Sequence, residues 1–131
     1  MTDARLQAVV ELWTTYRESG ADPAIALLHP DVEFVDHEGR RFEGHDGVRG
    51  FFEEFAVRGE EFRASPFTFE LHEPDLLVVG HRRIKSDEGL QGDYLFFVHS
   101  VSDGRVSRIA ACNSREEALA DIAARASDGP A

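Results

Sequence analysis

An aspartate among apolar residues is the first side chain of this sequence that could do chemistry. Asp36 lies in the stretch DVEFVDHEGRRFEG, residues 31–44, which is typical of a strand, a tight turn and a second strand. Alternation along the first strand places Asp36 on the same face as Val32 and Phe34. A carboxyl group in an apolar cavity is harder to ionise, which suits it to exchange protons near neutral pH. Asp36 is therefore a candidate catalytic base, and its alternative role is to bond the backbone of the HEGR turn.

Three further side chains could complete such a site. Histidine titrates at about pH 6.5, so His81 or His99 could serve as a second acid or base. The alternative for each is a structural histidine whose ring is satisfied within the fold. Tyr16 could donate a hydrogen bond to a substrate oxygen, or it could be the last core residue of the first helix. The remaining histidines lie in or beside turns and are expected in solvent: His29, His37, His45 and His72.

The elements that must position these side chains follow from hydrophobic periodicity. Apolar residues at helical spacing predict helices within residues 4–20, 21–31, 45–59 and 114–126. Gly20 is expected to end the first helix, and Asp22 and Asp46 to cap the second and third. β-Branched and aromatic residues between turn signals predict an antiparallel meander of four strands, within residues 61–72, 75–86, 90–102 and 104–113. This order, without alternating strand and helix units, indicates an α+β fold.

Strand alternation offers two sets of side chains on residues 90–102. If Asp36 faces inward, the same side of the sheet could carry one of two alternatives, and both contain apolar residues. Periodicity therefore leaves two sets open: Asp93, Leu95, Phe97 and His99, or Tyr94, Phe96, Val98 and Ser100.

Composition and charge exclude several classes of partner. The chain has 131 residues, and its 14 basic against 25 acidic residues give a net charge of −11. Such a charge repels nucleic-acid phosphates and anionic lipid headgroups, so we expect neither nucleic acid nor a membrane as partner. The N-terminal residues lack the features of a secretory signal, which favours a cytoplasmic location.

A single domain without a metal is the simplest organisation for this chain. Its length is sufficient for one core, and we expect a domain over residues 1–126 with a frayed tail over 127–131. Cys112 is the lone cysteine, and no cysteine and histidine pair has zinc-ligand spacing. We therefore expect neither a disulfide nor a metal or organic cofactor.

The order of elements, together with three local stretches, resembles the SnoaL-like branch of the NTF2-like superfamily. The stretches are ADPAIALLHPDVEF, FEGHDGVRGFF and SDGRVSRI, and the resemblance covers nearly the whole chain. It implies a strongly curved, mostly antiparallel sheet wrapped around N-terminal helices into a cone, with a short C-terminal helix. It also implies a pocket at the open end and a homodimer through the outer sheet face. This fold hosts ketosteroid isomerases, polyketide cyclases, epoxide hydrolases, dehydratases and binding modules, so the fold alone does not choose among them.

The resemblance also implies positions for the site residues. Asp36 falls at the proton-shuttling position of ketosteroid isomerases and Tyr16 at the position of their tyrosine donor. In those enzymes the tyrosine and a protonated aspartic acid together stabilise the dienolate. Phe97 stands where they carry that protonated acid, with Asp93 as a possible substitute, and the loss of this donor argues against steroid isomerisation. By the same resemblance, the set of Asp93, Leu95, Phe97 and His99 faces the pocket. It is joined by Phe34, His81, Arg83, Ile109, Ala111 and Asn113.

Two classes of function follow from this site. One is acid/base isomerisation, cyclisation or dehydration beside a carbonyl of a small apolar, aromatic or polyketide-like substrate. The other is a non-catalytic ligand-binding or dimeric protein-interaction module, including an adaptor whose pocket is filled by its own side chains.

Overall fold

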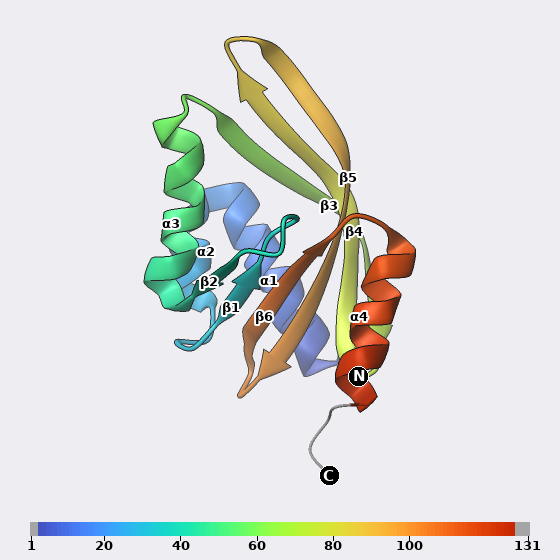
Figure 1. The fold of residues 1–131 in the computed structure, drawn as a ribbon. Helices are drawn as coiled ribbons and strands as arrows, with labels where there is room; N and C mark the ends of the chain where they lie inside the picture. The colour runs from blue at the N-terminus through green and yellow to red at the C-terminus, as the bar shows by residue number, and fades with distance from the viewer. Residues whose placement is uncertain (1–2, 128–131) are drawn as a thin grey trace.

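The chain folds as an α+β structure in which three helices lie against one face of a curved sheet and a fourth against the other (Figure 1). This computed structural model describes residues 3–127. The helices are α1 (Ala4–Ser19), α2 (Ala21–Leu27), α3 (Gly44–Val57) and α4 (Arg115–Ser127). The strands are β1 (Glu33–Val35), β2 (Arg41–Glu43), β3 (Glu61–His72), β4 (Asp75–Ser86), β5 (Gly89–Ser102) and β6 (Arg105–Cys112). The predicted fold class is confirmed.

The six strands form one sheet in the order β2-β1-β6-β5-β4-β3. Strands β3 to β6 form the predicted antiparallel meander. The short β1–β2 hairpin joins it through a parallel pairing of β1 with β6, with Phe34 opposite Ile109. This pairing brings the hairpin of Asp36 beside the last strand of the meander.

Local signals set most element ends, with small differences at two helices. Gly20 adopts a φ of 92° after α1, a conformation open to glycine, and its N–H bonds the Tyr16 carbonyl. The second helix begins at Ala21, one residue before the expected cap at Asp22. The third begins at Gly44, before the expected cap at Asp46, because the Gly44 N–H bonds the Val32 carbonyl at 2.7 Å and turns the chain directly from β2 into the helix.

The C-terminal helix begins as predicted. The Glu117 N–H donates to the Ser114 hydroxyl at 3.0 Å, which is one half of a capping box. Of the tail expected over residues 127–131, Ser127 ends α4 and residues 128–131 lie outside the described part of the chain.

The sheet separates two hydrophobic clusters. The larger one, here called the inner cluster, is formed by α1, α2, α3 and the sheet face that carries Val78, Leu95 and Phe97. The smaller one, the outer cluster, lies between α4 and the opposite face, and its buried members are Leu77, Val98, Ala110, Cys112, Ala118 and Ile122. Most of the expected site residues belong to the inner cluster or border it.

Candidate functional site

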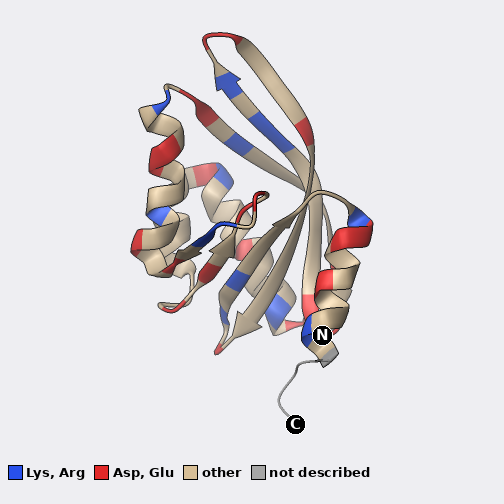
Figure 2. Ribbon diagram, in the orientation of Figure 1, with Lys and Arg blue, Asp and Glu red and all other residues tan. Residues whose placement is uncertain are grey.

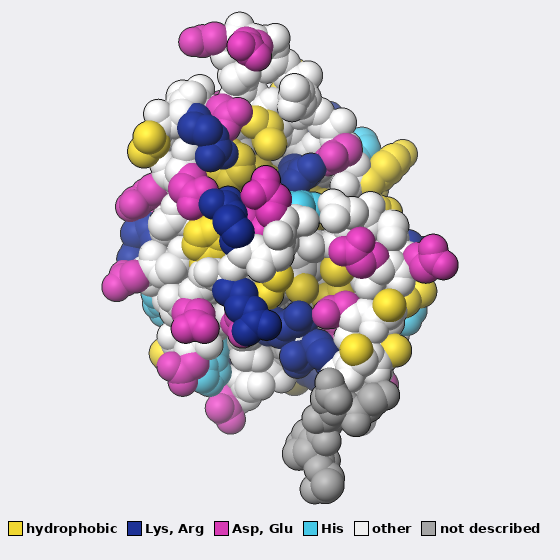
Figure 3. Space-filling view, viewed as in Figure 1, with side chains coloured by type: hydrophobic (Ala, Val, Ile, Leu, Met, Phe, Trp, Pro, Cys, Tyr) yellow, Lys and Arg dark blue, Asp and Glu magenta, His cyan; other side chains and the backbone are white. Residues whose placement is uncertain are grey.

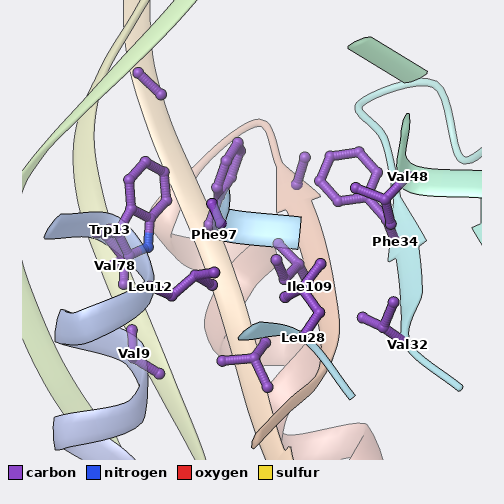
Figure 4. Packing of buried hydrophobic residues seen from close by; sticks show 14 of the residues in the cluster. Val9, Leu12, Trp13, Leu28, Val32, Phe34, Val48, Val78, Phe97 and Ile109 are labelled. Carbon is purple, nitrogen blue, oxygen red and sulfur yellow. The ribbon is translucent and has the colours of Figure 1, made fainter. Parts of the chain in front are cut away.

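A cavity of about 60 Å³ lies inside the inner cluster. Its helical side is formed by side chains of α1, α2 and α3, chiefly Leu12, Trp13, Tyr16, Ala24, Ile25 and Phe51. Its sheet side is formed by Phe34, Phe62, Ala64, Phe97, His99 and Ile109. Figure 4 shows Trp13, Phe97, Ile109 and Phe34 around this interior, contributed by four separate elements. The lining is thus almost wholly apolar and aromatic.

Tyr16 brings a hydroxyl group to this lining. The ring packs edge-on against Trp13 and tilted against Phe52, with centroid distances of 6.1 and 5.8 Å. Its hydroxyl donates to the Phe62 carbonyl over 3.4 Å, near the limit for a hydrogen bond. Burial raises the pKa of Tyr16 to about 12, so the hydroxyl keeps its proton at neutral pH. It is a donor that is only weakly engaged.

His99 is a fully buried histidine whose two ring nitrogens are both occupied. The Trp13 Nε1–H donates to Nε2 of His99 at 3.1 Å, and Nδ1 of His99 lies 3.1 Å from the Phe97 carbonyl. The ring therefore carries its proton on Nδ1 and accepts at Nε2. Burial lowers the pKa of His99 to about 4, which keeps the ring neutral. In this arrangement the histidine holds α1 against β5.

Asp36 is buried, with 6% of its surface exposed, and its carboxylate organises the turn between β1 and β2. Oδ1 accepts from the backbone N–H groups of Glu38 and Arg40, both at 2.9 Å. Oδ2 accepts from Nε of Arg40 at 2.8 Å, and the same guanidinium lies 3.0 Å from Glu54 of α3. Both carboxylate oxygens are thus engaged in the turn, and Asp36 does not contribute to the cavity lining.

The structure distributes the other expected ligand contacts over both faces of the sheet. Leu95, Phe97 and His99 lie on the inner face, where Leu95 is fully buried beside the lining. His81 lies on the opposite face, in register with Tyr94, and its ring is 4.5 Å from the exposed ring of Phe67.

Arg83 also lies on the outer face, because β4 alternates and places Val78, Gly80 and Arg82 inward. The inward orientation expected for His81 and Arg83 therefore differs from the structure. Asn113 is exposed beyond the end of β6. The homodimer expected through the outer face stays a prediction.

A polar cluster of Arg82, Asp93 and His37 borders residues of the cavity lining, and of these three only Asp93 is an expected pocket residue. Arg82 faces Asp93 across β4 and β5, with Nε–Oδ1 and Nη2–Oδ2 distances of 3.1 and 2.8 Å. Its Nη1 lies 2.7 Å from Nδ1 of His37, and the His37 ring is 6.1 Å from that of Phe97. Burial, followed by the positive charge of Arg82, lowers the pKa of His37.

Part of this cluster could have been found from the sequence. Strand alternation alone places Arg82 on the face of Val78, but His37 belongs to a turn, which favours a place in solvent.

Figure 2 shows basic and acidic positions on the same ends of β4 and β5, and Figure 3 shows basic, acidic and histidine side chains mixed on one face.

Two further features concern metals and membranes. Within residues 3–127, no group of three or more histidine, cysteine, aspartate or glutamate side chains could hold a metal ion. Among the described helices, none is long and apolar enough to cross a membrane.

Comparison with solved structures identifies proteins of the same fold. TerC co-crystallised with polyporic acid matches with a TM-score of 0.73 and 22% identity, over 83% of this chain and 90% of that one. A putative polyketide cyclase from Xanthomonas campestris pv. campestris matches with a TM-score of 0.70 and 16% identity, over 92% and 99%. The Δ5-3-ketosteroid isomerase from Mycobacterium sp. matches with a TM-score of 0.67 and 11% identity, over 88% and 97%.

Sequence comparison assigns the family. A search of curated proteins found no match. The family model of the SnoaL-like domain matches residues 6–109, which is most of the chain and runs from within α1 to within β6. The chain therefore belongs to the SnoaL-like domain family.

Proposed function

We propose that this protein binds a small, largely apolar molecule, aromatic or polyketide-like, in the cavity of the inner cluster. The observation that carries the proposal is the lining, in which the Tyr16 hydroxyl is the weakly engaged polar group among apolar and aromatic side chains. Pockets for small molecules are typically apolar with a few polar groups that fix orientation. Trp13, Phe34, Phe51 and Phe97 offer ring faces and edges to an aromatic ligand.

The size of the cavity restricts the ligand. Its volume of about 60 Å³ is smaller than the roughly 150 Å³ of an engineered apolar cavity that takes up benzene. A ring-sized ligand must therefore displace lining side chains. Phe52 and Phe62 are only half-buried at the cavity and can move toward solvent at lower cost than buried residues. TerC, a protein of the same fold, was co-crystallised with polyporic acid, which supports a small molecule as the ligand.

The proposal is tested with the single tryptophan of the chain. Trp13 lines the cavity, and its indole N–H gives one isolated resonance in a nitrogen–proton NMR spectrum. Titration with ethylbenzene should shift this resonance in a saturable manner. Ala24→Leu, which adds bulk to the lining, should weaken binding at least tenfold, because the added side chain competes for the same space.

Ala120→Leu is the control, since it adds the same atoms at an exposed position of α4. It should leave the affinity unchanged. An indole resonance that ethylbenzene does not move, or that moves equally in the Ala24→Leu variant, would contradict binding in the cavity.

Proton transfer beside a carbonyl is the second candidate function, and Tyr16 favours it. A buried hydroxyl that stays protonated and whose own bond is 3.4 Å long can turn toward a substrate oxygen. Asp36 is the proposed base, and it would act from its position in the β1–β2 turn after Arg40 moves away. The reaction class is isomerisation, cyclisation or dehydration.

Isomerisation of cyclohex-3-en-1-one to the conjugated ketone, followed by ultraviolet absorbance, tests this candidate. Asp36→Asn should reduce turnover on the order of a hundredfold or more with little change in ligand affinity, as expected for a lost general base. Normal turnover by the Asp36→Asn protein would show that another group moves the proton.

A further inference from the structure

The cluster of His37, Arg82 and Asp93 lies directly beside the cavity, although the three residues come from two strands and a turn. In the β3–β4 register, Arg82 is opposite Ala64, which lines the cavity. The His37 ring lies 6.1 Å from the ring of Phe97, another lining residue. The side chain of Arg82 is 21% exposed, so its guanidinium is partly open rather than sealed in the core.

The contacts within the cluster leave an N–H donor of Arg82 for a ligand. A guanidinium has five N–H groups, and each terminal nitrogen carries two. Nε and Nη2 of Arg82 each donate to Asp93, so a second N–H on Nη2 has no partner among residues 3–127. Nη1 lies 2.7 Å from Nδ1 and 3.2 Å from Nε2 of His37, so both ring nitrogens of His37 are next to Arg82 and the ring holds the guanidinium in place.

We propose that Arg82, held in place by His37 and Asp93, forms a second recognition site of this pocket, which binds the carbonyl oxygen of a ligand whose apolar body occupies the cavity. The second N–H on Nη2 of Arg82, next to an apolar lining, matches an oxygen acceptor at the end of an apolar molecule. Asp93 already balances the charge of Arg82, and the negative charges of Asp36 and Glu117 also act on His37. An uncharged carbonyl therefore fits this site better than a carboxylate does. The inference rests on the binding function proposed above.

Three probes of similar size separate the cavity from the recognition site. Acetophenone and ethylbenzene have nearly the same shape and differ by one carbonyl oxygen, and benzoate carries a negative charge instead. Their dissociation constants are measured from the Trp13 indole resonance in the natural protein and in the Arg82→Met and His37→Phe variants. Lys85→Met is the control, because it removes the same charge from an exposed position on the opposite face of β4.

The decisive quantity is the ratio of the ethylbenzene to the acetophenone dissociation constant. This ratio should fall about tenfold in Arg82→Met, the expected effect of one hydrogen bond to a charged donor, and should stay unchanged in Lys85→Met. His37→Phe should lower it in the same direction. The position of the indole resonance without ligand verifies that each variant keeps the inner cluster.

Each other outcome counts against one part of the proposal. An equal ratio in the natural protein and the Arg82→Met variant overturns the recognition site, while ethylbenzene binding still supports the cavity. Benzoate binding tenfold tighter than acetophenone, with loss in Arg82→Met, overturns the carbonyl in favour of an anion. If neither ethylbenzene nor acetophenone moves the resonance, the cavity itself does not bind, and the inference fails with it.

Discussion

The two faces of one sheet carry cores of different construction. The inner cluster packs three helices through large rings, including Trp13, Phe34, Phe51 and Phe97, and it leaves a cavity. The buried members of the outer cluster are small or aliphatic, such as Ala110, Ala118 and Ile122, and one ring, that of Phe96, packs half-buried against them. In this protein the cavity lies on the face whose buried core is built mainly from aromatic rings.

Charge contributes differently to the two faces as well. Helix α4 is tied to the sheet by Arg108–Asp121 at 2.9 Å and by Arg125 with the buried Asp75 at 3.1 Å. On the other side, Arg40 and Arg82 instead hold Asp36 and His37 of the β1–β2 turn. The ion pairs of the outer face fasten a helix, whereas the contacts of Arg40 and Arg82 fasten a turn.

The largest expected effects come from shortening one isoleucine on each side. Ile25 of α2 lines the cavity and Ile122 of α4 lies in the outer cluster, and both are buried. Ile25→Ala and Ile122→Ala should each lower the free energy of unfolding by about 2–5 kcal/mol, measured by urea denaturation. At one fixed concentration, a hundred times the dissociation constant for Ile25→Ala, ethylbenzene should restore about 2.7 kcal/mol to that variant, because it binds only the folded protein. The gain of the natural protein at the same concentration should be smaller, because its cavity is smaller.

Ile122→Ala provides the contrast for that measurement. Its gain in stability from ethylbenzene should equal that of the natural protein, since the space it creates lies across the sheet from the cavity. A larger gain for Ile122→Ala than for Ile25→Ala would reverse the assignment of the two faces.

The next prediction concerns the stability in acid of the inner face, where His99 is buried. The pKa of His99 is about 4 in the folded protein and about 6.5 in the unfolded chain, so the unfolded chain binds more protons between these values. The contribution of His99 to stability is therefore complete above about pH 6.5 and is lost as the pH falls toward 4. Its full size is roughly 3 kcal/mol on the linkage relation.

His99→Gln isolates this contribution, because glutamine does not titrate and can still both donate and accept hydrogen bonds. Between pH 7 and 4.5, the natural protein should lose more stability than His99→Gln, as measured by urea denaturation at each pH. Parallel pH profiles would mean that His99 is not the neutral, buried link between Trp13 and Phe97 that the structure describes.

Much of the fold could be predicted from local pattern. The strand signals of residues 61–72 and 75–86 coincide with β3 and β4, because alternating apolar residues and the EPD turn lie next to each other in the chain. Gly20 and Ser114 mark helix ends for similarly local reasons. The start of α3 does not follow from local pattern. A hydrogen bond from Gly44 to Val32, twelve residues earlier, places the helix start before the expected cap at Asp46.

The candidate site could be predicted less completely. Five residues that the sequence suggests for a site all line the cavity: Tyr16, Phe34, Phe97, His99 and Ile109. Side-chain periodicity leaves two faces of residues 90–102 open, and the contacts of each face with different helices resolve them. His81 and Arg83 lie on the outer face, while Arg82, one residue between them, points inward.

By itself, the sequence determined the class of the fold, its elements and the identity of the side chains that could do chemistry. Those properties depend on neighbours a few residues apart, and the chain order contains them. Only the tertiary structure decided that His99 is bonded at both ring nitrogens and that His37 meets Arg82. The contacts of His99 with Trp13 and of His37 with Arg82 join residues 86 and 45 positions apart, so they exist only after the sheet and helices have packed.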